Sequence, residues 1–145
     1  MKTLYNQNRF ANYSAEPKIP KIFHNLYYGN ESMKNPVFQT FYEESCRKLH
    51  PDWTFMHWGP VEIEELPYNK DLLEELLSER GDYAKVKDYI ALEVLIKYGG
   101  VFVDMDLFCL KPLDELHHRY SYYAFTHPYA NTRSPTINAG LIAAT

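Results

Sequence analysis

A long apolar helix pattern that runs into a short apolar strand constrains this chain more than any other feature. Residues 82–98 repeat apolar side chains at helical spacing and carry apolar character well around the cylinder, so we expect a largely buried helix. Gly99 and Gly100 end this pattern, and the unbroken apolar run 101–103 is typical of a strand covered on both faces. A buried helix followed directly by a buried strand indicates an α/β domain.

Further apolar segments extend this alternation along the chain. We expect strands at residues 19–24, 53–58, 121–126 and 137–144, and helices at residues 36–49 and 71–80. The 145 residues fit one domain, which we place at residues 17–145 behind a flexible polar arm at residues 1–16. Residues 128–135, which prolines bound, are expected to form a loop. The predicted fold class is therefore α/β with a mainly parallel central sheet.

Charge, hydropathy and cysteine content narrow the possible partners and compartment. The net charge of −4 argues against binding to nucleic acid, because displacing its counterions requires a basic face. No segment reaches the length of a membrane span, and residues 1–16 lack the apolar core of a signal peptide, so we expect a cytoplasmic protein. Cys46 and Cys109 imply no disulfide framework and favour a reducing compartment, although their pairing stays open.

Two carboxylates follow the expected buried strand directly. Asp104 and Asp106 are separated by one residue, so strand alternation would point both side chains the same way at the carboxyl end of the strand. Ligands of open α/β sheets bind at that edge. Two aligned carboxylates repel unless a cation lies between them, and their hard oxygens suit Mg²⁺ or Mn²⁺ completed by substrate phosphates. The alternative is a pair of solvated acids at the mouth of a loop.

Asp88 is an acidic residue within the helical pattern of residues 82–98. Its helical neighbours three and four positions away are Ala84, Ala91, Leu92 and Leu95. A carboxylate on such a face is costly unless it is paired or used, so we expect Asp88 to be partly desolvated. It forms either a salt bridge, with a neighbour such as Lys87 or with a distant arginine, or part of a site.

The segment that contains these acids resembles a known family. Residues 84–106 combine a helix that carries Ala84 and Asp88, then Tyr-Gly-Gly, an apolar strand and Asp-x-Asp. This order resembles the glycosyltransferases with a DXD-containing sugar-binding region, which include fungal Golgi mannosyltransferases and bacterial capsule enzymes. The family is also similar to the catalytic domain of the large clostridial glucosylating toxins. Residues 19–29, 110–113 and 138–140 look like further elements of the family in the family's order.

The resemblance implies a GT-A, Rossmann-like nucleotide-sugar-binding domain and a metal-dependent, retaining glycosyltransferase. By this likeness Asp106 ligates Mn²⁺ or Mg²⁺, while Asp104 contacts donor hydroxyls and reaches the metal through water. Asp88 would accept a hydrogen bond from the donor sugar. Tyr27 stands where the family has a Trp near the base, and Asn138 would contact sugar or phosphate. The implied partners are a nucleotide-sugar donor and a glycan or protein acceptor, as in polysaccharide biosynthesis.

Two substitutions and the early end of the chain separate it from the family pattern. Ala91 stands where the family has an Arg that contacts the donor, and Lys87 replaces a Ser. The chain also stops soon after Asn138, so we expect the C-terminal acceptor part of the family to be absent or abbreviated.

Two other functions compete with the glycosyltransferase. A catalytically silent nucleotide-sugar-binding or interaction module of the same fold is favoured by Ala91 and by the short C-terminus. A metal-dependent phosphohydrolase ranks last, since the sequence has no His or Lys clearly placed as its acid or base. His24, within the first expected strand, is interpreted as a satisfied core histidine.

Overall fold

The computed structural model describes residues 12–28, 36–78, 83–127 and 136–145. Its strands are β1 (Ile22–Leu26), β2 (Thr54–Trp58), β3 (Gly100–Val103), β4 (Tyr122–His127) and β5 (Thr136–Ala144). Its helices are α2 (Pro36–Leu49), α3 (Pro60–Ile63), α4 (Lys70–Ser78), α5 (Tyr83–Tyr98) and α6 (Asp114–Arg119). Every strand and helix expected from the sequence is present, with bounds that differ by up to three residues.

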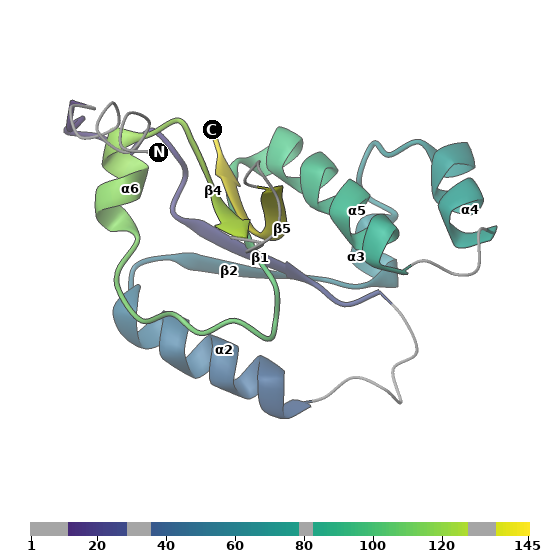
Figure 1. The fold of residues 1–145 in the computed structure, drawn as a ribbon, viewed down its shortest axis with the longest axis horizontal. Helices are drawn as coiled ribbons and strands as arrows, with labels where there is room; N and C mark the ends of the chain where they lie inside the picture. Colours follow the sequence, from purple (N-terminus) through teal and green to yellow (C-terminus); the bar gives the residue numbers. More distant parts are fainter. Residues whose placement is uncertain (1–11, 29–35, 79–82, 128–135) are drawn as a thin grey trace.

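The strands form one five-stranded sheet in the order β2-β1-β3-β5-β4 (Figure 1). β1 lies in the middle of a parallel group and pairs with both β2 and β3. β5 runs antiparallel to β3 and to β4. The predicted α/β class is confirmed, and the parallel strands make up the β2-β1-β3 half of the sheet. Their carboxyl ends therefore lie at one shared edge.

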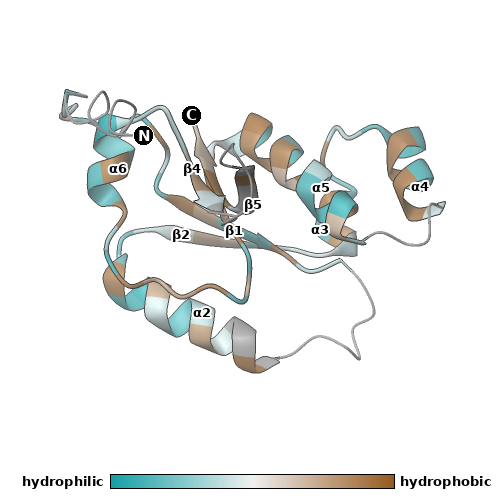
Figure 2. Cartoon of the chain, viewed as in Figure 1, coloured by the Kyte–Doolittle hydropathy of each residue, from teal (hydrophilic) through white to brown (hydrophobic). Residues whose placement is uncertain are grey.

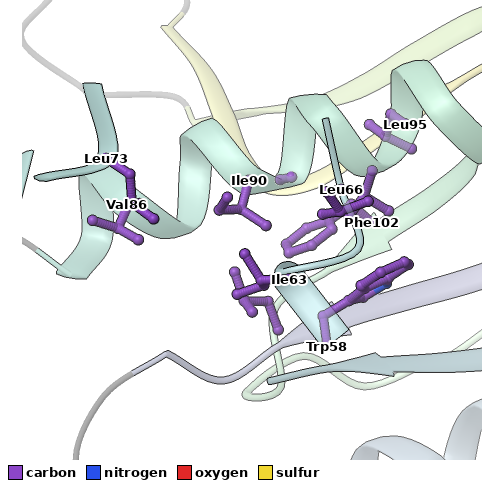
Figure 3. Packing of buried hydrophobic residues seen from close by; sticks show 11 residues of the cluster. Trp58, Ile63, Leu66, Leu73, Val86, Ile90, Leu95 and Phe102 are labelled. Atoms are coloured by element: carbon purple, nitrogen blue, oxygen red, sulfur yellow. The ribbon is translucent and has the colours of Figure 1, made fainter. Parts of the chain in front are cut away.

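The sheet separates two apolar clusters, and β3 contributes to both. Phe102 belongs to the cluster with Trp58, Ile63 and Ile90, in which α5 covers one face of the sheet (Figure 3). Val101 belongs to the other cluster, which includes side chains of α2. Successive strand side chains point to opposite faces, so this division follows from the pleat. All four residues of β3 are buried, as the apolar run predicted.

The outer side of α5 departs from the prediction of a largely buried helix. Leu92 and Ile96 are 50% and 78% exposed, while Ile90, Val94 and Leu95 are buried. The hydrophobic colouring of α5 is therefore not confined to its buried face (Figure 2). A helix that lies on one face of a sheet buries one side, so apolar residues around the whole cylinder did not require burial on every side.

Two short helices were not expected from the sequence. α3 begins after Gly59, and Glu62 Oε2 accepts a hydrogen bond from Gly59 N at 2.9 Å, which caps its first turn. α6 has acidic residues in its first turn and basic residues in its last turn, as the helix dipole favours. Both are too short to show helical periodicity in the sequence. None of the helices in the described ranges is long and apolar enough for a membrane crossing.

Cys46 and Cys109 form a disulfide, the pairing that the sequence left open. Their Cα atoms are 4.9 Å apart, and the bond ties α2 to the segment that follows β3 and runs beside α2 (Figure 1). Disulfides are rare in reducing compartments, so this bond does not favour the predicted cytoplasmic location, which stays an untested prediction.

The predicted N-terminal arm lies partly within the described residues. Residues 1–11, like the expected loop 128–135, lie outside them. Within the described part of the arm, Ser14 N donates to His118 O at 2.9 Å, and the Tyr13 ring stacks on His118 at a centroid distance of 4.6 Å. The predicted boundary between arm and domain stays a prediction.

Candidate functional site

Two glycines bring α5 and β3 together as a compact pair. Gly99 has φ +63° and its N–H donates to Leu95 O at 2.9 Å, which ends α5 in the left-handed conformation that favours glycine. Gly100 has φ +96° and opens β3. A Cβ at Gly100 would lie 2.6 Å from Ile22 O, so β1 leaves no space for a side chain there. After this reversal β3 runs back along α5, and its end lies near the start of that helix, where Asp88 and Asp104 come close together.

A lysine bridges two of the three predicted carboxylates. Lys87 Nζ lies 2.7 Å from Asp104 Oδ1 and 3.6 Å from Asp88 Oδ1. Lys87 and Asp88 belong to the second turn of α5, and Asp104 is the first residue after β3. The side chains of Lys87 and Asp104 are each 26% exposed, so their contact is partly shielded from solvent. The fold thus brings Asp88 and Asp104 to one place around a shared ammonium.

The Asp104–Asp106 segment is a turn and not an extension of the strand. Asp104 N donates to Gly140 O at 2.9 Å, and Leu107 N donates back to Asp104 O at 3.2 Å. β3 ends at Val103, so strand alternation does not set the directions of the two carboxylates, and that argument from the sequence was wrong. Asp106 is exposed in the turn, and Asp104 is half-buried. Both still lie at the carboxyl edge of the parallel strands.

Asp88 is more exposed than the sequence predicted. Its side chain is 52% exposed and its carboxylate pairs with Lys87. Of the apolar neighbours that suggested burial, Ala91 and Leu95 are buried and Leu92 is 50% exposed, so Asp88 lies toward the exposed side of α5. The predicted desolvation is wrong, while the predicted pairing with a neighbouring lysine is present.

Tyr27 and Asn138 follow different strands. Tyr27 directly follows β1, is half-buried, and its N–H donates to Trp58 O at 3.0 Å. It therefore lies at the same sheet edge as Asp104, because β1 and β3 are parallel. Asn138 lies in β5, where its backbone pairs with Phe125 across the sheet. The side chain of Asn138 lies outside the described parts, so its predicted contact stays a prediction.

His24 is a core histidine, as the sequence indicated. It is fully buried, its Nε2–H donates to Gly99 O at 2.9 Å, and Trp58 Nε1–H donates to its Nδ1 at 3.2 Å. Burial lowers the pKa of His24 to about 4. Both ring nitrogens are occupied by protein partners, so His24 is not available as a metal ligand.

The chemistry of the residues present fits a hard divalent cation that is completed by a ligand. Asp104 and Asp106 offer carboxylate oxygens, and the carboxylate of Asp104 already pairs with a cation, the ammonium of Lys87. Within the described residues, no group of three or more His, Cys, Asp or Glu side chains gathers to hold a metal alone. Mg²⁺ bound by one or two carboxylates and by substrate phosphates needs no such group.

Comparison with known proteins gives the family. A family model described as the glycosyltransferase sugar-binding region containing a DXD motif matches residues 36–123. The match covers more than half of the chain and includes α5, β3 and the Asp104–Asp106 turn. The chain belongs to this glycosyltransferase family. Asp104-Met105-Asp106 is an Asp-x-Asp sequence within the matched residues.

Relatives of known name support the assignment to this glycosyltransferase family. Inositol phosphoceramide mannosyltransferase 3 of Schizosaccharomyces pombe is 30% identical over 128 residues, which cover 86% of this chain and 34% of that protein. Mannosyl phosphorylinositol ceramide synthase CSH1 of Saccharomyces cerevisiae is 31% identical over 112 residues, which cover 72% of this chain and 27% of that protein. The chain thus spans about a third of the length of these curated relatives.

A solved structure shows the same fold. The glycosyltransferase PaToxG superimposes with a TM-score of 0.65 at 18% sequence identity, over 99% of this chain and 62% of that chain. Identity this low carries the fold alone. The GT-A-like fold that the resemblance implied is confirmed.

Sequence reasoning did not identify Lys87 as the partner of Asp104. The two residues are 17 positions apart in the sequence, and Lys87 was considered only as a possible partner of its neighbour Asp88. The signal was available in principle, because a helix that precedes a parallel strand runs back along it and places its own start near the end of the strand. Ala91, a residue of α5 at the position where the family pattern has Arg, is 1% exposed and belongs to the core cluster of Phe102.

Proposed function

We propose that this chain is the donor-binding part of a glycosyltransferase that transfers a sugar from a nucleotide-sugar donor to a glycan, protein or other acceptor. The observation that carries the proposal is the cluster of Lys87, Asp88 and Asp104 at the carboxyl edge of a buried parallel strand, inside the family's DXD segment. Donor chemistry requires groups that bind a diphosphate and a sugar side by side. This edge presents a cation and carboxylates together.

Each proposed residue has a separate role. Asp106, exposed in the turn, and Asp104, through water, would hold Mn²⁺ or Mg²⁺, which supplies a Lewis acid that neutralises the leaving diphosphate. Asp88 is half-exposed, so its carboxylate can accept a hydrogen bond from a hydroxyl of the donor sugar. Tyr27 would stack its ring on the base. Asn138 would contact sugar or phosphate.

The reaction replaces one bond at the anomeric carbon of the sugar. The bond from that carbon to the diphosphate oxygen breaks, and its electron pair leaves on the diphosphate. The acceptor hydroxyl oxygen bonds to the same carbon, and the proton of that hydroxyl leaves with the nucleoside diphosphate. We propose retention of anomeric configuration, on the strength of the family resemblance. The chain's residues position the donor so that the acceptor oxygen meets a fixed anomeric carbon.

A silent nucleotide-sugar-binding module is the second candidate. The observation that favours it is Ala91, a buried small residue where the family pattern has a cationic donor contact. Loss of one electrostatic contact to a transferring group lowers turnover by orders of magnitude while binding persists. The two candidates therefore agree on binding and differ on turnover.

Calorimetric titration with UDP-glucose and GDP-mannose tests the shared part of both candidates. We expect binding of one donor in Mn²⁺ and loss of that binding in excess EDTA, because the carboxylates and the diphosphate repel without a cation. Equal affinity in EDTA and in Mn²⁺ would remove the metal from the proposal. Release of nucleoside diphosphate over time, with water or added sugars as acceptor, then separates the enzyme from the silent module.

A further inference from the structure

Lys87 is the cation that the described structure places among the site's carboxylates. Its ammonium contacts Asp104 Oδ1 at 2.7 Å and Asp88 Oδ1 at 3.6 Å, from a side chain that is 26% exposed. A lysine ammonium sits on a flexible four-carbon stem and has three rotatable donors. Lys87 can therefore change partners without movement of the α5 backbone.

The net charge of the site changes when a metal and then a donor bind. Asp88, Asp104 and Asp106 carry three negative charges, and Lys87 offsets one of them. A bound divalent cation would bring the cluster to about neutrality, and an incoming nucleoside diphosphate would add negative charge again. Charge-assisted hydrogen bonds to phosphate are the strong ones, and Lys87 is positioned to supply one. A lysine that only held α5 to the Asp104–Asp106 turn would have no role when the diphosphate binds.

A divalent cation held directly by Asp106, and by Asp104 through water, would lie close to the ammonium of Lys87 and would compete with it for the charge of Asp104. The metal ion and the ammonium are both positive and would repel each other. The contact between Lys87 and Asp104 is partly shielded from water, so solvent screens this repulsion incompletely. Metal entry therefore favours release of Lys87 from Asp104. The released ammonium remains within reach of any diphosphate that completes the coordination of the metal.

We propose that Lys87 is a donor-binding residue that exchanges its partner: it neutralises Asp104 in the empty site, and it binds an oxygen of the donor diphosphate when a divalent cation, which Asp104 reaches through water, offsets the charge of Asp104 instead. This inference rests on the proposed function. It assigns to Lys87 a role in recognising nucleoside diphosphates, and it makes the empty site resistant to metal binding in the absence of a donor.

Three variants of the full chain test the exchange. Lys87→Gln removes the charge at similar length, and Lys87→Arg keeps a cation. Lys97→Gln is the matched control, since Lys97 belongs to the same helix, about 15 Å further along its axis, and contacts Glu65 O and the Tyr98 ring. The probes are Mn²⁺ alone, followed by GDP and UDP at saturating Mn²⁺. A melting curve of each variant reports whether it folds.

The exchange predicts changes in opposite directions. Lys87→Gln should bind Mn²⁺ alone about threefold to fivefold more tightly, because a competitor for Asp104 is gone. The same variant should bind the preferred diphosphate roughly tenfold or more weakly, because a charge-assisted hydrogen bond is lost. Lys87→Arg should keep diphosphate affinity within about threefold, and Lys97→Gln should change neither affinity.

Other outcomes overturn the inference in ways that separate it from the proposed function. A Lys87→Gln variant with both affinities unchanged, or with both lowered together with its melting temperature, would show a scaffold salt bridge only. A lowered diphosphate affinity with unchanged Mn²⁺ affinity would overturn the exchange and leave Lys87 as a phosphate contact. If the unsubstituted chain binds neither diphosphate in Mn²⁺, the proposed function fails. The Mn²⁺ titration alone then still decides whether Lys87 opposes metal binding.

Discussion

Acidification should destabilise this protein well above the pH at which carboxylates titrate, because three histidines, His24, His50 and His117, are fully buried and burial lowers the pKa of each. His24 and His117 are both fully buried, and burial lowers the pKa of each to about 4 from an ordinary value of 6.5. His24 accepts a hydrogen bond from Trp58 Nε1 at its Nδ1, so a proton there would place two donors face to face. The His24 ring therefore resists protonation in the folded state.

The sign and size of the effect follow from linkage. Between pH 6.5 and 4 the unfolded chain binds a proton at His24 and at His117 and the folded chain does not. The free energy of unfolding is therefore highest above pH 6.5, falls as the pH drops through this window, and levels off below pH 4. Each histidine contributes about 2.5 kcal/mol between about pH 7.5 and 4.5, or about 5 kcal/mol together. That is a large part of the stability of an ordinary domain.

Denaturant unfolding at a series of pH values, followed by tryptophan fluorescence, measures this slope directly. We expect His24 and His117 to contribute about 2.5 kcal/mol per pH unit near the middle of the window, and His24→Gln or His117→Gln to remove about half of that contribution. His118→Gln is the control for replacement of a histidine outside the core clusters. A free energy of unfolding that stays level between about pH 7 and 5 would refute the reasoning, since it would mean that none of the buried rings excludes a proton.

Three further predictions concern the turn, the metal and the disulfide. Gly100→Ala should lower the free energy of unfolding by about 3 kcal/mol or more in chemical denaturation, because its Cβ would lie 2.6 Å from a carbonyl oxygen of β1 at a φ of +96°. Asp106→Asn should weaken Mn²⁺-dependent nucleotide-sugar binding in calorimetry more than Asp104→Asn, because a direct ligand loses a charged bond; the reverse order would exchange their assigned roles. Paired Cys46→Ser and Cys109→Ser substitutions should cost about 4 kcal/mol of stability in urea unfolding, from release of a closure across 63 residues.

Much of the fold could be predicted from the sequence because its signals are local. The apolar repeat of α5, the Gly99-Gly100 stop and the apolar run of β3 each depend on neighbouring residues, and all three hold in the structure. The α/β class followed from their alternation. α3 and α6 were missed for the same reason, since each is shorter than the window over which helical periodicity can be recognised.

The family and its acidic residues were also readable from order along the chain. The DXD turn after a buried strand, preceded by Asp88 on a helix, required no contact map to recognise. The exposure of Asp88 could not be predicted from the sequence. Apolar neighbours at helical spacing occur both around a buried side chain and around a side chain on an exposed face of a helix. Burial depends on which side of the helix meets the sheet, and that is a property of the packed molecule.

The sequence by itself determined the strands, the longer helices, the fold class and the acids proposed for the site, since each depends on the types and spacing of nearby residues. Tertiary structure decided which charges meet. Lys87 and Asp104 are 17 residues apart, and only the reversal at Gly99-Gly100 brings their atoms to 2.7 Å, just as only the packing of α2 against the segment after β3 joins Cys46 to Cys109. Coulomb energy and covalent pairing depend on distances in space, and the folded chain sets those distances through contacts that no local pattern records.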